Sequence, residues 1–252
     1  MEANPALQAL DAELMQRLAE RTALAAEQAH PGGRPDLIGA FETETLRQLL
    51  AAPHPSLRPA TLVRIWRELM AEARAGHGGT LPTRIAVWPG RDAARAIDLA
   101  RLRFGAASPL TLEAQPEAAL AVARTEGGVA VLALDGERPW WGRLLAEPSL
   151  KVFAALPCLA SLGDTAALAV GLAAPEPTGA DLTFWVTDAN WPAPAVVEAL
   201  GRDGVAAERL AEAGGLKLFV LAGYYQNLDP RLARAPGRLS GVIGAAPAPF
   251  RV

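Results

Sequence analysis

The sequence predicts a helical unit followed by an α/β domain. In the first part of the chain, apolar residues recur at the three- and four-residue steps of amphipathic helices. A glycine-rich stretch at residues 76–82 then interrupts the pattern. Beyond it, short apolar runs alternate with helical segments, which is typical of an α/β domain. We therefore predict a helical domain at residues 1–77 and an α/β domain at residues 83–252.

Leucines define the first helix, because Leu7, Leu10, Leu14 and Leu18 lie on one face of a 3.6-residue period. Prolines and glycines at residues 31–35 end it, since proline lacks a backbone donor and disfavours helix before itself. Similar patterns, again separated by prolines, follow twice. The expected helices lie at residues 5–29, 36–52 and 59–75.

The α/β domain is expected to alternate short buried strands with helices. Its apolar runs are five to nine residues long, the length of strands rather than helices. We predict strands at residues 84–88, 110–114, 128–134, 167–172, 181–187, 216–224 and 240–246. We predict helices at residues 91–105, 116–126 and 193–200.

Composition excludes several classes of function. The net charge is −3 and Lys/Arg residues do not cluster, which argues against a nucleic-acid or anionic membrane partner. No apolar stretch is long enough for a membrane span, and the chain starts with acidic rather than basic residues, so we expect a cytoplasmic protein. One cysteine and three scattered histidines predict neither a metal site nor a disulfide. No cofactor is expected.

The single cysteine and a pair of tryptophans each allow two interpretations. Cys158 lies in an apolar run, AALPCLASL, which favours a small buried thiol over a catalytic nucleophile. Trp140 and Trp141 either pack in the core or stack on a ring-shaped ligand. We favour the core for both tryptophans.

Three segments of the first unit resemble the helices of the all-helical chorismate mutases. ALDAELMQRLAERTALA at residues 9–25 resembles the first helix of that family. FETETLRQLL at 41–50 is similar to the start of its second helix, and LRPATLVRIWRELMAEA at 57–73 is similar to its third. The resemblance implies a mutase-like fold whose helices exchange between subunits, and hence a homodimer formed through the helical domain.

The rest of the chain resembles the α/β domain that follows the mutase in chains related to bifunctional mutase-dehydratases. The resemblance rests on PWW at residues 139–141, EPTG at 176–179 and DPRL at 229–232. It implies a two-lobed domain of type II periplasmic-binding-protein character, as in prephenate dehydratase. Leu182 and Thr183 replace the Thr-Arg pair of the dehydratase motif, so dehydratase activity is not expected.

The mutase resemblance implies an isomerase that converts chorismate to prephenate in aromatic amino-acid biosynthesis. That chemistry needs fixed cations and donors where negative charge develops. Arg21 matches an arginine that grips a substrate carboxylate, and Glu42 matches a glutamate that fixes the ring hydroxyl. Arg34, Arg47 and His77 are the candidate substrate-binding groups near them. The implied partner is a small carboxylate such as chorismate or prephenate.

The matching site is depleted, because this sequence lacks several cations of the family. Asn4 and Phe41 stand where the family has arginines, and Gly32 or Gly33 stands where it has a lysine. Each missing donor commonly removes about 2.7–4 kcal/mol of transition-state stabilisation. Three interpretations follow: a mutase-type isomerase, an inactive ligand-binding or regulatory protein that keeps the helical fold for dimerisation, or a structural partner of another enzyme of the pathway.

Overall fold

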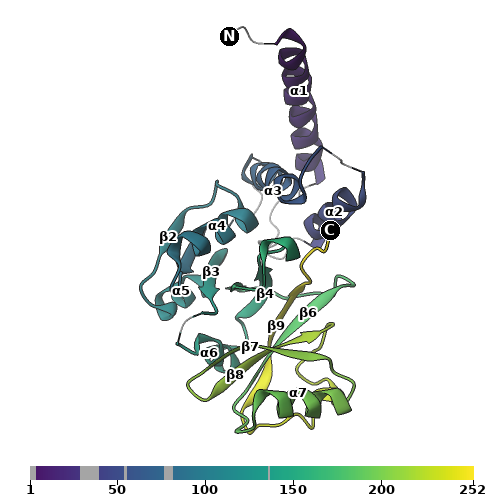
Figure 1. Cartoon of the computed structure of the whole chain (residues 1–252). Helices are drawn as coiled ribbons and strands as arrows, with labels where there is room; N and C mark the ends of the chain where they lie inside the picture. Colours follow the sequence, from purple (N-terminus) through teal and green to yellow (C-terminus); the bar gives the residue numbers. More distant parts are fainter. Residues whose placement is uncertain (1–3, 29–39, 54–55, 77–81, 136) are drawn as a thin grey trace.

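The structure is a computed structural model that describes residues 4–28, 40–53, 56–76, 82–135 and 137–252 (Figure 1). Its α-helices are α1 (Pro5–Gln28), α2 (Ala40–Ala51), α3 (Pro59–Gly76), α4 (Ala93–Phe104), α5 (Pro116–Ala123), α6 (Arg143–Ala146) and α7 (Ala193–Arg202). Its strands are β1 (Arg84–Trp88), β2 (Leu110–Leu112), β3 (Gly128–Ala133), β4 (Lys151–Leu156), β5 (Ala167–Gly171), β6 (Asp181–Thr187), β7 (Ala207–Ala213), β8 (Leu216–Ala222) and β9 (Ser240–Pro247).

The helix α1 projects away from the rest of the molecule (Figure 1). Asn4 caps its first turn, where the side-chain oxygen accepts a hydrogen bond of 3.0 Å from the backbone N–H of Ala6. Every residue from Asn4 to Arg17 is exposed, and only the C-terminal part of the helix packs against α3. Among the described helices, α1 included, none has the length and apolar character needed to cross a membrane.

The helices α2 and α3 share a core with the sheet domain. Leu46 and Leu50 of α2 and Leu62 of α3 pack in one cluster with Leu102 of α4 and with Leu159, which follows β4. The helical segments therefore bury their apolar stripes partly against each other and partly against the α/β domain.

All nine strands belong to one mixed sheet, in the order β2-β1-β3-β5-β4-β9-β6-β8-β7. The strand β1 is parallel to both β2 and β3, whereas most of the remaining pairs are antiparallel. Alternate residues of β1 face opposite layers: Ile85 and Val87 pack with α4, while Ala86 and Trp88 pack with α5. Both faces of this part of the sheet are thus covered by helices, as buried parallel strands require.

The two halves of the sheet join where β9 meets β4. The two strands are parallel there and pair at Val152 and Gly244. Gly244 has φ +152°, and a Cβ atom at this position would lie 2.1 Å from the carbonyl oxygen of Val152. The junction therefore depends on a residue without a side chain.

The prediction of a two-lobed domain of periplasmic-binding-protein type was wrong. β9 is hydrogen-bonded to β4 on one side and to β6 on the other, so one continuous sheet replaces two separate lobes. Two strands also escaped prediction. β4 overlaps the apolar run at residues 154–162 only in its last three residues, and no strand is predicted there. β7 carries Glu208, Arg209 and Glu212 on an exposed edge, where charges are common.

Candidate functional site

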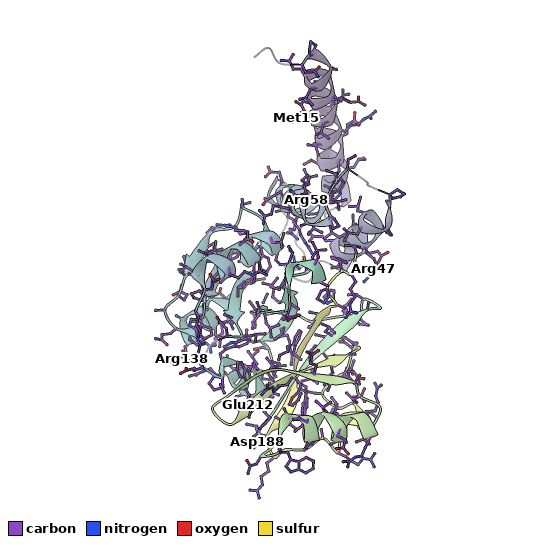
Figure 2. All side chains as sticks on the ribbon, viewed as in Figure 1. Met15, Arg47, Arg58, Arg138, Asp188 and Glu212 are labelled. Atoms are coloured by element: carbon purple, nitrogen blue, oxygen red, sulfur yellow. The ribbon has the colours of Figure 1, made fainter. Side chains whose placement is uncertain are left out.

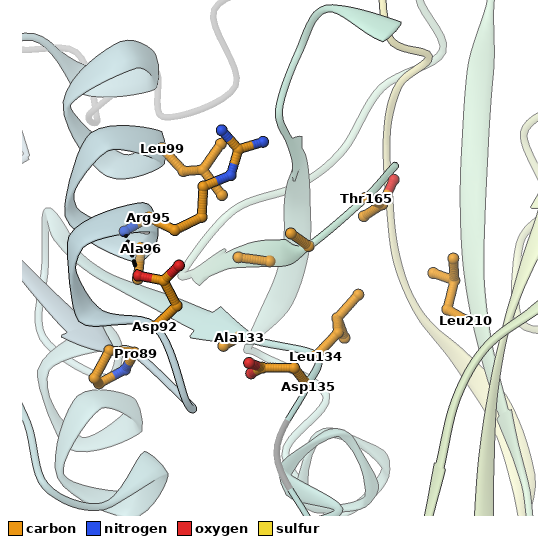
Figure 3. Close-up of a pocket in the computed structure, with 12 residues that line it drawn as sticks. Pro89, Asp92, Arg95, Ala96, Leu99, Ala133, Leu134, Asp135, Thr165 and Leu210 are labelled. Carbon is orange, nitrogen blue, oxygen red and sulfur yellow. Dashed lines mark hydrogen bonds between the residues drawn. The ribbon is translucent and has the colours of Figure 1, made fainter. Parts of the chain in front are cut away.

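A cavity of about 270 Å³ lies at the carboxyl ends of β1 and β3 (Figure 3). The chain leaves β1 through α4 toward β2, and leaves β3 in the opposite direction, toward β5 and β4. In α/β sheets, a crevice forms where neighbouring strands send their connections to opposite sides, and ligands bind there. Leu210 of β7, at the far edge of the sheet, also lines the cavity, so the sheet curls to enclose it.

The turn between β1 and α4 forms one wall of the cavity. Asp92 caps α4 by accepting a hydrogen bond of 2.9 Å from the backbone N–H of Arg95. Gly90 has φ +60°, and a Cβ atom there would lie 2.0 Å from an oxygen of Asp135. This close approach lets the backbone N–H of Arg91 donate to Asp135 at 3.2 Å. The turn and the loop after β3 are therefore fixed to each other.

Arg95 is the cation of the cavity. Its Nη2 atom donates a hydrogen bond of 2.6 Å to the carbonyl oxygen of Leu162, which anchors the guanidinium at the upper wall in Figure 3. Thr165, in the loop that precedes β5, lies across the cavity from α4. The apolar part of the lining includes Ala96, Leu99, Leu134 and Leu210.

The lining thus combines one guanidinium, two carboxylates, a hydroxyl and an apolar wall. Small-molecule sites typically have this form, with a few polar groups that orient a ligand and apolar groups that cover it. The described residues contain no group of three or more side chains suited to hold a metal ion. The cavity can therefore bind a small organic molecule through its guanidinium, its two carboxylates and its apolar wall.

A second charged cluster lies between the helices and the sheet. Glu42 of α2 pairs with Arg67 at 2.9 Å and also with Arg74, and Arg103 of α4 lies beside them. Burial by itself would raise the pKa of Glu42, but attraction to Arg74, Arg67 and Arg103 outweighs it and lowers the pKa below its ordinary value. Burial, with repulsion from Arg67, lowers the pKa of Arg103 to about 9.

The predicted site residues are not brought together among the described residues. Arg21 lies on α1, half-buried, and its Nη1 atom makes no hydrogen bond within the described part of the chain. Glu42 is engaged by two arginines, and Arg47 lies on the surface of α2 paired with Glu44 (Figure 2). Arg34 and His77 lie outside the described residues.

The structure places the two tryptophans and the cysteine for which the sequence leaves two interpretations. Trp140 and Trp141 are 2% and 1% exposed and contact each other edge to face, 5.7 Å between ring centroids. They pack in the core and line none of the described cavities. Cys158 is half-buried and lies beside the buried arginines Arg67 and Arg103.

Sequence reasoning missed Asp92, Arg95, Asp135 and Thr165. The segment WPGRDAARA at residues 88–96 lacks the glycine spacing of a phosphate-binding loop, so no known motif marks it. A signal was nevertheless present, since Asp92 is a helix-capping residue four positions after the end of a buried strand. Asp135 follows the next parallel strand, and the carboxyl ends of parallel strands meet at one edge of a sheet.

Comparisons with known proteins give little. No family model matches the chain, and no curated protein matches it. One solved structure is similar, described as "GqqA- a novel type of quorum quenching acylases". It shares 19% sequence identity at a TM-score of 0.44, and the match covers 66% of this chain and 95% of that one. A likeness of this size carries no conclusion about activity.

The assignment to the chorismate mutase family was wrong, and with it the isomerase function and the place in aromatic amino-acid biosynthesis. No mutase or dehydratase is found by any of the comparisons. The matching segments were leucine-rich amphipathic helices, whose pattern any helix that packs on one side will share. Glu42, the one carboxylate among the predicted site residues, is held by Arg67 and Arg74.

Proposed function

We propose that the protein binds a small organic carboxylate in the cavity at the carboxyl ends of β1 and β3. The observation that carries this proposal is the position of Arg95. Its guanidinium is anchored by Leu162 at the wall of a cavity that lies where the strand connections diverge. Arginine suits a carboxylate because its planar fork donates two parallel hydrogen bonds.

The cavity fits a ligand smaller than most drug-like molecules. Its volume of about 270 Å³ lies just below the range of roughly 300–1,000 Å³ that is typical of small-molecule sites. Leu99, Leu134 and Leu210 offer apolar contact on two sides. The ligand therefore combines a carboxylate with an apolar body.

Filling the cavity should abolish binding without unfolding the protein. Leu210 is half-buried at the cavity wall, so Leu210→Trp places an indole in the space of the ligand. A ligand at about 100 times its Kd stabilises the native state by about 2.7 kcal/mol, which raises Tm by several degrees. We expect this shift with the wild type and not with Leu210→Trp, in a thermal-shift screen of short-chain carboxylates, keto acids and amino acids.

Leu228→Trp is the matched control, because Leu228 is 95% exposed and lies outside the cavity lining. It should bind like the wild type. Equal binding by Leu210→Trp and the wild type would place the ligand elsewhere, and no shift with any compound of the screen would refute a carboxylate-binding function.

Pairing of two copies through α1 is also proposed. Leu7, Leu10 and Leu14 are 57%, 62% and 57% exposed. The same stripe continues into Leu18, which is half-buried where α1 packs on α3. Most of the stability of a helix in a protein comes from packing of its apolar face, so a second copy that covers the exposed leucines would stabilise α1.

Leu14→Glu should convert such a dimer to a monomer. Leu14 is 57% exposed in the single chain, so the change chiefly removes contacts with the second copy. Sedimentation equilibrium should give twice 26.4 kDa for the wild type and 26.4 kDa for the variant. Gln16→Glu, on the opposite face of α1, should stay dimeric. A wild type that remains monomeric at high concentration would contradict the pairing.

We propose a cytoplasmic location, which fits a chain with a single cysteine and hence no intrachain disulfide. Fractionation of cells that express a tagged chain tests it.

A further inference from the structure

The charges of the cavity point to more than a carboxylate. Asp92 and Asp135 contribute two negative charges and Arg95 one positive charge, so the lining is net negative by one. A ligand with a carboxylate alone would add a further negative charge beside two fixed ones. Like charges within one cavity repel, and the repulsion is stronger when the ligand displaces water. The ligand therefore needs a cationic group as well.

Both aspartates have an oxygen available for that group. One oxygen of Asp92 accepts from the N–H of Arg95, and one oxygen of Asp135 accepts from the N–H of Arg91. These bonds fix the carboxylates, while the second oxygen of each accepts no hydrogen bond from the described residues. Figure 3 shows the two carboxylates directed toward the space between α4 and the loop after β3. An ammonium group has three donors and matches two such acceptors.

The opposite side of the cavity supplies donors. Arg95 uses Nη2 on the carbonyl oxygen of Leu162, and its Nε and Nη1 atoms donate to no other described residue. The Thr165 hydroxyl likewise has no hydrogen-bond partner in the described part of the chain, and lines the cavity. A carboxylate between Arg95 and Thr165 would accept from both.

We propose that the cavity binds the zwitterion of an α-amino acid with an apolar side chain. Asp92 and Asp135 hold the ammonium group, Arg95 and Thr165 hold the carboxylate, and the apolar side chain lies on Leu134 and Leu210. This inference rests on the proposed function and specifies its ligand.

The test uses probes that share one skeleton and differ in charge. They are L-leucine, N-acetyl-L-leucine, which lacks the ammonium, and L-leucinamide, which lacks the carboxylate. The same three forms of L-phenylalanine extend the series to a larger side chain. Isothermal titration should show that at least one parent amino acid binds, and that each of its two blocked forms binds about tenfold more weakly or worse, because each loses a charged hydrogen-bonded contact.

Two variants assign the ends of the ligand. Asp135→Asn keeps an acceptor for Arg91 and removes the charge, so it should weaken the parent amino acid about tenfold and leave the N-acetyl form unchanged. Arg95→Gln should weaken the parent and leave the amide unchanged. Asp98→Asn, an exposed position on α4 outside the lining, and Arg202→Ala, an exposed position on α7, are the controls and should bind like the wild type.

The outcomes separate this inference from the proposed function. If the N-acetyl form binds as tightly as its parent, and Leu210→Trp abolishes both, the cavity is a carboxylate site and the zwitterion is refuted. If an amino acid binds equally to the wild type and to Leu210→Trp, both proposals fail for this cavity. If neither parent amino acid binds but another carboxylate of the screen does, only the zwitterion is refuted.

Discussion

Glu42→Ala is expected to lower the free energy of unfolding by about 3 to 5 kcal/mol. Glu42 accepts hydrogen bonds from Arg67 and Arg74, whose side chains are 4% and 18% exposed. Without its carboxylate, both guanidinium groups stay buried near Arg103 and lose their shared counter-charge. Urea unfolding followed by circular dichroism measures the change. It should appear as a lower midpoint with an unaltered slope.

The same ion cluster predicts how stability depends on pH. The pKa of Glu42 in the folded protein lies below its ordinary value of 4.5, so the folded state binds the proton less readily than the unfolded state. Its contribution to stability is present above pH 4.5 and is lost as the pH falls through the folded pKa. The difference between wild type and Glu42→Ala should therefore shrink on acidification, which unfolding curves at decreasing pH will show.

Glu44→Ala is the matched control on the same helix. Glu44 pairs with Arg47 at the surface, and both side chains are well exposed, at 50% and 37%. Exposed pairs of this kind contribute about 0.3–0.5 kcal/mol. Equal losses for Glu42→Ala and Glu44→Ala would show that the buried cluster adds no stability beyond a surface pair.

Glu42 also shows where sequence reasoning reached its limit. The apolar pattern was sufficient to place α2 and α3, because the spacing of apolar residues along a helix is a local property of the sequence. The partners of Glu42 are Arg67 and Arg74 on another helix, 25 and 32 residues away. Spacing along the chain does not tell which of many arginines a glutamate will meet. The sequence therefore could not show that Glu42 lies in a buried cluster with these two arginines.

The cavity shows the same limit of sequence reasoning, because the elements around it were predicted but their arrangement in the sheet was not. The strands β1 and β3 and the helix α4 were predicted near their observed positions, and Asp92 and Asp135 each follow a strand directly or within a few residues. What the sequence did not contain was the order of the strands. The parallel pairing of β1 with β3 brings these two loops to one edge, and the curl of the sheet brings Leu210 to face them.

Gly244→Ala is expected to destabilise the protein by at least about 3 kcal/mol, through clash and backbone strain at one point. The added methyl would lie 2.1 Å from the carbonyl oxygen and 2.5 Å from the nitrogen of Val152. Both are backbone atoms of β4, which no rotamer change moves aside. The φ of +152° is itself strained for any residue with a Cβ atom. Thermal unfolding measured by calorimetry tests the expectation.

The contrast with Gly201→Ala isolates the cause. Gly201 lies in the last turn of α7, and a Cβ atom there meets nothing within 4 Å. Alanine at that helical position should stabilise the protein by roughly 0.5–1 kcal/mol, opposite in sign to the change at Gly244.

Because Gly244 lies where β9 crosses from β6 to β4, its substitution should weaken the sheet at the junction of its two halves. Amide hydrogen exchange should then show lost protection first in β4 and β9, with β1 and β3 less affected. If Gly244→Ala were as stable as the wild type, β9 would not approach β4 this closely, and the nine strands would not form one continuous sheet.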